Sequence, residues 1–194
     1  MRLFERTFEV TAHTRVLDVG GSARIWQFAR VQPRLTIVNL SAALEAVNPS
    51  IARVAGDGCM LPFKNRAFDI VFSNSVIEHV GGPAQRERFA CEIARVGRSY
   101  WVQTPNRRFP VEMHLMLPLV QFLPKSWQRA LVRRFTVWQL VAEPSRAQRE
   151  YYIEHFLNEL HLLDARELQA LFPDARILRE RFLGLTKSLI AVRT

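Results

Sequence analysis

The fold of this chain is decided by residues 16–21, Val-Leu-Asp-Val-Gly-Gly. A short run of apolar and β-branched residues ends in one acidic residue and two glycines, and a helix start follows. This order is typical of the first strand of a parallel α/β sheet, which presents a small-molecule cofactor at its carboxyl end. The two glycines allow a sharp turn and a close approach of the ligand to the backbone.

Strand-like and helix-like segments alternate along the rest of the chain. We expect strands at 15–19, 35–40, 51–55, 68–73 and 99–103 and helices at 23–31, 83–96, 149–160 and 165–172, with Ser22 placed to cap the first helix and Pro33 to close it. Two strand-like runs, 175–182 and 187–192, close the chain. The tight link between them favours an antiparallel hairpin, because a parallel pair needs a long crossover.

Composition predicts one globular domain, residues 1–194. The chain has 194 residues, of which 48% are apolar, and shows no shift in composition. Cys59 and Cys91 are interpreted as reduced thiols, and neither a signal peptide nor a membrane-spanning run of about 20 apolar residues is evident, so we expect a cytoplasmic protein.

The net charge of +9 could attract nucleic acid, an anionic membrane or an acidic protein. An arginine bias on a solvated surface explains it equally well.

Residues 104–144 interrupt the alternation with five prolines around short apolar segments. Within this insert, residues 113–141 combine apolar clusters with basic residues and with Trp127 and Trp138. Such a segment can be a lid over the substrate, a peripheral contact with a membrane interface, or ordinary core packing with solvated arginines. We expect a lid and leave the membrane contact open.

The chain resembles the class I S-adenosylmethionine-dependent methyltransferases, close to the small bacterial type 11 group. The resemblance rests on residues 17–21, on 55–58 followed by Leu-Pro-Phe at 61–63, and above all on the long string at 68–80, Phe-Asp-Ile-Val-Phe-Ser-Asn-Ser-Val-Ile-Glu-His-Val. It covers residues 15–104. It implies a Rossmann-like three-layer sandwich with a seven-stranded, mostly parallel sheet. The seventh strand would run antiparallel between the fifth and sixth, and a helical insert would follow strand five.

The resemblance also implies a cofactor, S-adenosylmethionine, and residues that bind it. The methionine portion would lie at Gly20 and Gly21, with Asp18 on the side of its ammonium group. Asn39, at the end of the second strand, corresponds to the residue that meets the ribose.

Further binding residues follow the third and fourth strands. Asp57 matches the residue that accepts a hydrogen bond from the adenine amino group, and the backbone at Gly58 and Cys59 would complete that edge. Asn74 matches the residue that lines the methionine portion.

Each of these positions also has a purely structural interpretation. Asp18 could brace the turn, Asn39 could be a turn residue, and Asp57 could form an Asx turn. Cofactor binding is favoured because four separate loops converge on one sheet edge.

Two departures from the family pattern point to weaker cofactor binding or an adjusted pose of the cofactor. Ser22 and Arg24 replace later glycines, and the neutral Asn39 replaces an Asp or Glu, although charged hydrogen-bond acceptors are the stronger ones.

Methyl transfer needs positioning more than side-chain chemistry, because the sulfonium group is already activated. A hydroxyl or amine acceptor would still benefit from a base, and the candidates are His79, Glu112 and His114. His79 could instead orient its loop, and Glu112 and His114 could belong to a polar loop face.

Some relatives bind a metal through Glu-x-x-Glu-His, but Ser75 stands where the first glutamate would be. We therefore predict no metal.

Three functions are compatible with the sequence. The first is methyl transfer to a small-molecule or lipid- or glycan-linked acceptor, with oxygen as the expected acceptor atom. The second is nucleic-acid methylation. An RNA-binding module is absent, the aromatic residues sit in apolar clusters, and the amino-methylating motif is replaced by Ser-Asn-Ser-Val at 73–76, all of which argue against it. The third is a catalytically silent binding partner. The acceptor and the oligomeric state stay undetermined.

Overall fold

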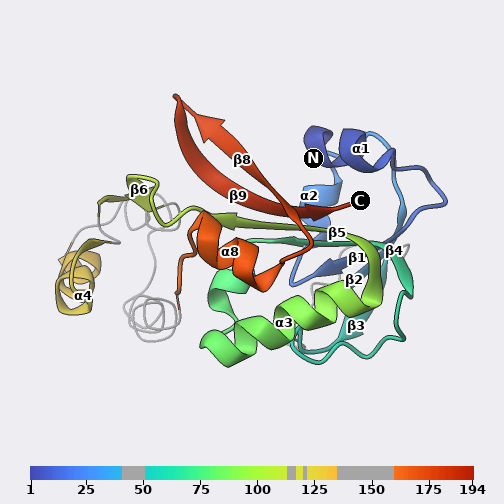
Figure 1. Cartoon of the computed structure of the whole chain (residues 1–194), viewed down its shortest axis with the longest axis horizontal. Coiled ribbons are helices and arrows are strands. Elements are labelled where there is room, and N and C mark those ends of the chain that lie inside the picture. The colour runs from blue at the N-terminus through green and yellow to red at the C-terminus, as the bar shows by residue number, and fades with distance from the viewer. Residues whose placement is uncertain (41–50, 113–116, 120–121, 135–159) are drawn as a thin grey trace.

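The computed structural model describes residues 1–40, 51–112, 117–119, 122–134 and 160–194. Within them, seven strands form one sheet in the order β3-β2-β1-β4-β5-β9-β8 (Figure 1). The strands are β1 (Arg15–Val19), β2 (Arg34–Asn39), β3 (Ala52–Ala55), β4 (Phe68–Asn74), β5 (Gly97–Pro105), β8 (Arg176–Phe182) and β9 (Leu185–Arg193). Each expected strand is present, with bounds that differ by at most two residues.

The pairing of the strands confirms the expected topology. Strands β1 to β5 are parallel, and β9 lies antiparallel between β5 and β8. The hairpin turn between β8 and β9 has positive φ at both Leu183 and Gly184, as in a type I′ turn. The order of strands reverses between β1 and β4, and in open α/β sheets a crevice for ligands forms outside the carboxyl ends of such a strand pair.

Helices cover both faces of the sheet, giving three layers. Helices α3 (Pro83–Val96) and α8 (Ala165–Leu171) lie on one face, and α1 (Arg2–Phe8) and α2 (Ala23–Trp26) lie on the other (Figure 1). Side chains of a strand alternate between faces, so Leu17 and Val19 pack toward α3 while Val16 packs toward α1 and α2. The second face is closed by edge-to-face aromatic contacts of Phe4, Trp26, Phe72 and Trp101.

The prediction of a helix over 23–31 is wrong in length, because α2 ends at Trp26. Continuing the helix would require the Arg30 amide to donate to the Trp26 carbonyl. The Arg30 amide instead donates to Glu5 at 2.6 Å, and the Trp26 carbonyl accepts from the Gln32 side chain at 2.9 Å. Ser22 occupies the N-cap position, but its side chain makes no capping hydrogen bond.

The insert after β5 is described in part. It contains two short paired strands, β6 (Val111–Glu112) and β7 (Leu117–Pro118), and helix α4 (Lys125–Arg134). Most of the helix expected at 149–160 lies outside the described residues, as do residues 113–116, 120–121 and 135–144 of the insert. Helix α8 begins with a capping box, in which the Asp164 side chain accepts from the Arg166 and Glu167 amides. In the described part of the chain, no helix is long and apolar enough to cross a membrane.

Candidate cofactor site

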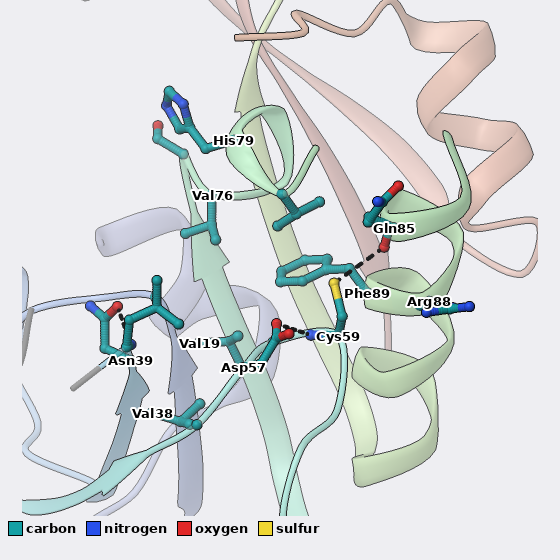
Figure 2. A pocket seen from close by; sticks show the side chains of 16 residues that line it. Val19, Val38, Asn39, Asp57, Cys59, Val76, His79, Gln85, Arg88 and Phe89 are labelled. Carbon is teal, nitrogen blue, oxygen red and sulfur yellow. Dashed lines mark hydrogen bonds between the residues drawn. The ribbon is translucent and has the colours of Figure 1, made fainter. Parts of the chain in front are cut away.

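A cavity of about 500 Å³ lies at the carboxyl ends of β1, β2 and β4. Its walls come from four segments: the glycine turn after β1, the end of β2, the loop after β3, and the loop after β4 with the first turns of α3 (Figure 2). Of the eight residues predicted to bind a cofactor, five line this cavity. They are Gly20, Asn39, Asp57, Gly58 and Cys59.

Only glycine fits the turn after β1. Gly20 has a φ of +75°, and a Cβ there would lie 2.6 Å from a methyl group of Val76. A Cβ on Gly21 would lie 1.9 Å from the carboxylate of Asp18. The turn is anchored by the Gly20 amide, which donates to the Val38 carbonyl at 2.8 Å. The two glycines therefore let the backbone pack directly against Val76 and Asp18, where a Cβ would clash.

Asp18 lies beneath the cavity and is not part of its lining. It is fully buried because its side chain points to the α2 face, where one carboxylate oxygen accepts from Trp26 Nε1 at 2.7 Å. The other oxygen, Oδ1, has no hydrogen-bond partner among the described residues. Burial raises the pKa of this carboxyl group to about 7, and the hydrogen bond from Trp26 opposes the shift. Asp18 thus supports the glycine turn from below, and its Oδ1 is an acceptor without a partner among the described residues.

Asn39 joins the end of β2 to the glycine turn. Its Nδ2 donates to the Gly21 carbonyl at 3.2 Å, and its Oδ1 accepts from the Leu40 amide at 2.9 Å. A carboxylate at this position could not donate to Gly21, so the amide provides a link that Asp or Glu would lose. Among the described residues, one amide hydrogen and one lone pair of Asn39 have no partner and could serve a ligand.

The loop after β3, residues 56–59, lines another part of the cavity. Oδ1 of Asp57 accepts from the Cys59 amide at 2.8 Å, which forms the Asx turn considered above, and Oδ2 accepts no hydrogen bond from the residues that the structure describes. A Cβ on Gly58 would lie 2.7 Å from the ring of Phe89, so glycine lets the loop pack directly on this ring. Burial and the neighbouring Asp57 raise the pKa of the Cys59 thiol.

The loop after β4 places a different residue from the one predicted. Asn74 ends β4 and is not part of the cavity lining, whereas Ser75 is. Ser75 has a φ of +57°, which is uncommon for a residue with a side chain, and its amide donates to the Gln103 carbonyl at 2.9 Å. This left-handed residue ends the strand geometry of β4, and Ser75, Val76 and His79 then line the cavity.

Of the three predicted catalytic residues, His79 lines the cavity. It lies at the end opposite Asp57 (Figure 2). Its neighbour Glu78 points away and is fully buried, where it accepts from the Thr104 hydroxyl at 2.9 Å. His114 is outside the described residues, and the placement of the Glu112 side chain is not described either. Among the described residues, no group of three or more His, Cys, Asp or Glu could hold a metal ion.

Sequence reasoning missed the apolar wall of the cavity. Val76 and Phe89 form it, and α3 also contributes Gln85 and Arg88 (Figure 2). The sequence predicted a helix over 83–96 but gave no role in the site to Phe89. The signal that could have identified it is topological: a crossover helix starts at the carboxyl edge of a parallel sheet, so inward residues of its first turns lie beside the ligand.

Comparisons with known proteins agree with this geometry. Residues 14–99 match the family model described as "Methyltransferase domain". Two uncharacterized proteins of Mycobacterium tuberculosis, from strains CDC 1551 and H37Rv, are 33% identical over 75 residues, which is 39% of this chain and 25% of each relative. The matched segment therefore spans a quarter of the length of these relatives.

Solved structures share the fold. Phosphoethanolamine N-methyltransferase 2 of Haemonchus contortus, in complex with phosphomonomethylethanolamine and S-adenosylhomocysteine, aligns at a TM-score of 0.58 and 15% identity over 92% of this chain and 37% of that chain. A Rhodobacter sphaeroides chain described as a putative zinc-dependent alcohol dehydrogenase aligns at 0.65 and 12% identity over 98% of this chain and 86% of that chain. At such identities the similarity shows the fold alone. Residues 14–99 are thus similar in sequence to a methyltransferase domain, and the described residues share the fold of a methyltransferase of known structure.

Proposed function

We propose that the cavity binds S-adenosylmethionine and that the chain transfers its methyl group to a small-molecule acceptor, at oxygen. The observation that carries this proposal is the convergence of Gly20, Asn39 and Asp57 on one cavity at the carboxyl edge of the sheet. The residues fit the cofactor. The glycine turn brings the backbone to the cavity at a position where a Cβ would clash with Val76, and Oδ1 of Asp18 is a buried acceptor without a partner among the described residues.

Each part of the cofactor has a counterpart in the cavity. The glycine turn, with Asp18 behind it, would hold the methionine portion, and the spare hydrogen-bonding capacity of Asn39 suits the ribose hydroxyls. Oδ2 of Asp57 would accept from the adenine amino group. Val76 and Phe89 supply an apolar wall for the adenine ring.

S-adenosylmethionine supplies a methyl group on a positively charged sulfur, which is an activated donor. The chain's contribution is then to position the acceptor and exclude water, and well-oriented systems gain about 7–11 kcal/mol in this way. His79 lies at the far end of the cavity from Asp57, where it would take the proton from an acceptor hydroxyl group. Glu78 and Thr104 hold the backbone beside His79 through their buried hydrogen bond.

Calorimetric titration tests the proposal. We expect saturable one-to-one binding of S-adenosylmethionine, weakened about tenfold or more by Asp57→Ala, which corresponds to at least about 1.4 kcal/mol. Asp69→Ala is the matched control, because Asp69 pairs with Arg15 at the opposite end of the sheet and should leave the affinity unchanged. Absence of binding by the folded wild-type protein would overturn the proposal.

A second titration, with NAD, separates this function from dinucleotide binding on the same fold. Dinucleotide sites place a pyrophosphate on the N-terminus of the helix after β1. Here that helix has four residues, too few to present a helix dipole to a pyrophosphate, so we expect no binding of NAD. Mass spectrometry of a deletion strain, searching for a metabolite that lacks one methylene, would then identify the acceptor.

A further inference from the structure

A second cavity, of about 450 Å³, lies beyond the carboxyl end of β5, between the start of α8 and the β8–β9 hairpin. Its polar lining consists of Asn106, Arg108, Asp164, Arg166 and Arg179, together with the Thr186 segment of the hairpin. We call it the arginine hollow. Leu185 and Leu189 add apolar surface from β9.

The single carboxylate in the arginine hollow is already saturated. Oδ1 of Asp164 accepts from the amides of Arg166 and Glu167, at 2.9 and 3.1 Å. Oδ2 accepts from the guanidinium groups of Arg107 and Arg108, at 3.0 and 3.3 Å. These interactions hold the pKa of Asp164 below its usual value, so the carboxylate is charged and has no free lone pair directed at further cations.

Two positive charges in the hollow are therefore uncompensated. Neither the Arg166 nor the Arg179 guanidinium group makes a hydrogen bond or ion pair with any part of the chain that the structure describes. The two residues come from different elements, since Arg166 is in the first turn of α8 and Arg179 is in β8. A concave surface with two unpaired guanidinium groups is suited to a phosphate group, whose oxygens match their paired N–H donors.

The arginine hollow lies on the same sheet edge as the cofactor cavity. Thr104, two residues before Asn106, donates to Glu78, and Glu78 adjoins His79 in the wall of the cofactor cavity. The His161 amide donates to the Glu78 carbonyl, and Asn106 pairs with Leu163. These hydrogen bonds connect the segments that line the two sites, with β4 leading to one and β5 to the other.

We propose that the arginine hollow binds the phosphate monoester group of the methyl acceptor through hydrogen bonds from the guanidinium groups of Arg166 and Arg179. Its role as an acceptor site rests on the proposed function above, whereas the phosphate binding itself does not. Asn106 is held by its bond to the Thr186 carbonyl at 2.8 Å, so it fixes the hairpin against β5 and keeps the hollow in shape. A phosphorylated metabolite and a phospholipid headgroup share this chemistry.

Calorimetry with glycerol 3-phosphate at low salt tests the proposal in solution. We expect saturable binding by the wild-type protein and a loss of about tenfold or more in the double variant Arg166→Gln/Arg179→Gln. Arg176→Gln is the matched control, because Arg176 is an exposed arginine of the same strand, β8, outside the hollow. Its affinity should stay within about twofold of the wild type.

A second arm identifies the source of the phosphate, using phosphatidylcholine vesicles with and without phosphatidic acid. Loss of binding by the double variant in solution alone supports a free metabolite, and loss in both arms supports a lipid headgroup. Equal binding by wild-type and double-variant protein in both arms, or no binding by the wild type in either, would overturn the proposal.

S-adenosylmethionine binding keeps the two proposals separable. The double variant should retain wild-type affinity for the cofactor, which also shows that it is folded. A wild-type protein that binds glycerol 3-phosphate through these arginines but not S-adenosylmethionine would support the phosphate site and overturn the proposed function.

Discussion

The cofactor cavity and the arginine hollow occupy the same edge of one sheet but differ in how their polar groups are paired. In the cofactor cavity, Asn39 and Asp57 already bond to the backbone around them, and glycines set the shape. In the arginine hollow, Arg166 and Arg179 have no partner among the described residues. The first site is organised before a ligand arrives, whereas the second holds charge that a ligand would neutralise.

This difference shows where each kind of specificity comes from. A site whose groups are fixed by the chain recognises one defined shape, and little ordering is needed on binding. A site with unpaired guanidinium groups recognises charge and tolerates variation in the rest of the ligand. The cofactor is constant across methyltransferases and the acceptor is not, so the two halves of the edge match the two roles proposed for them.

The largest expected effect comes from adding a side chain to the glycine turn, where it would displace the cavity-lining Val76. Gly20→Ala forces a side chain to a φ of +75° and against Val76 at 2.6 Å, so we expect at least about a hundredfold loss of affinity for S-adenosylmethionine. Gly184→Ala is the control, because Gly184 has a similar φ of +80° but nothing within 4 Å. It should cost about 1 kcal/mol of stability and leave cofactor affinity unchanged. Equal losses of affinity in both variants would show that strain, and not the displacement of Val76, governs binding.

An intermediate effect concerns the buried carboxyl group behind the turn. The folded-state pKa of Asp18, about 7, is above its value in the unfolded chain. Between these two values the folded state holds more protons than the unfolded state, so the Asp18 contribution lowers the free energy of unfolding as pH rises. Asp18→Asn removes this penalty and keeps an acceptor for Trp26 Nε1.

We therefore expect Asp18→Asn to gain stability relative to the wild type between pH 5 and pH 8. The gain should be on the order of a few kcal/mol, because one pKa unit corresponds to about 1.4 kcal/mol. Urea unfolding at both pH values measures it. Asp69→Asn is the control, since its pairing with Arg15 lowers the pKa of Asp69 and leaves this group ionised at both pH values. A stability difference for Asp18→Asn that does not change with pH would contradict the assigned pKa.

The smallest expected effect is that of ionic strength, which should act on one site and spare the other. Raising NaCl from about 0.05 to about 0.5 M should weaken glycerol 3-phosphate binding several-fold, because salt screens partly exposed charges within a Debye length of about 10 Å or less. S-adenosylmethionine affinity should change by less than about twofold, because Asp57 and Arg88 bring opposite charges to that cavity and the remaining lining, apart from His79, is uncharged. Equal salt dependence at the two sites would remove the contrast between them.

Local sequence patterns predicted most of the sheet and of α3, because strand and helix periodicity is a property of a few adjacent residues. The same patterns overestimated α2, where the competing hydrogen bonds come from Glu5 and Gln32. The family resemblance implied that Asn74 lines the cofactor site, whereas in the structure the next residue, the left-handed Ser75, lines the cavity.

The sequence by itself determined the order of strands and helices, the glycine turn and the loops that converge on the cofactor cavity. Only the tertiary structure decided that Asp18 is buried against Trp26, that Asn39 links β2 to Gly21, and that Arg166 and Arg179 meet in one hollow. The physical reason is the separation, along the chain, of the residues that interact. Backbone conformation follows from neighbouring residues, but the partner of a buried or charged side chain is fixed by the pairing of strands that are far apart in the chain, as when β9 enters the sheet between β5 and β8.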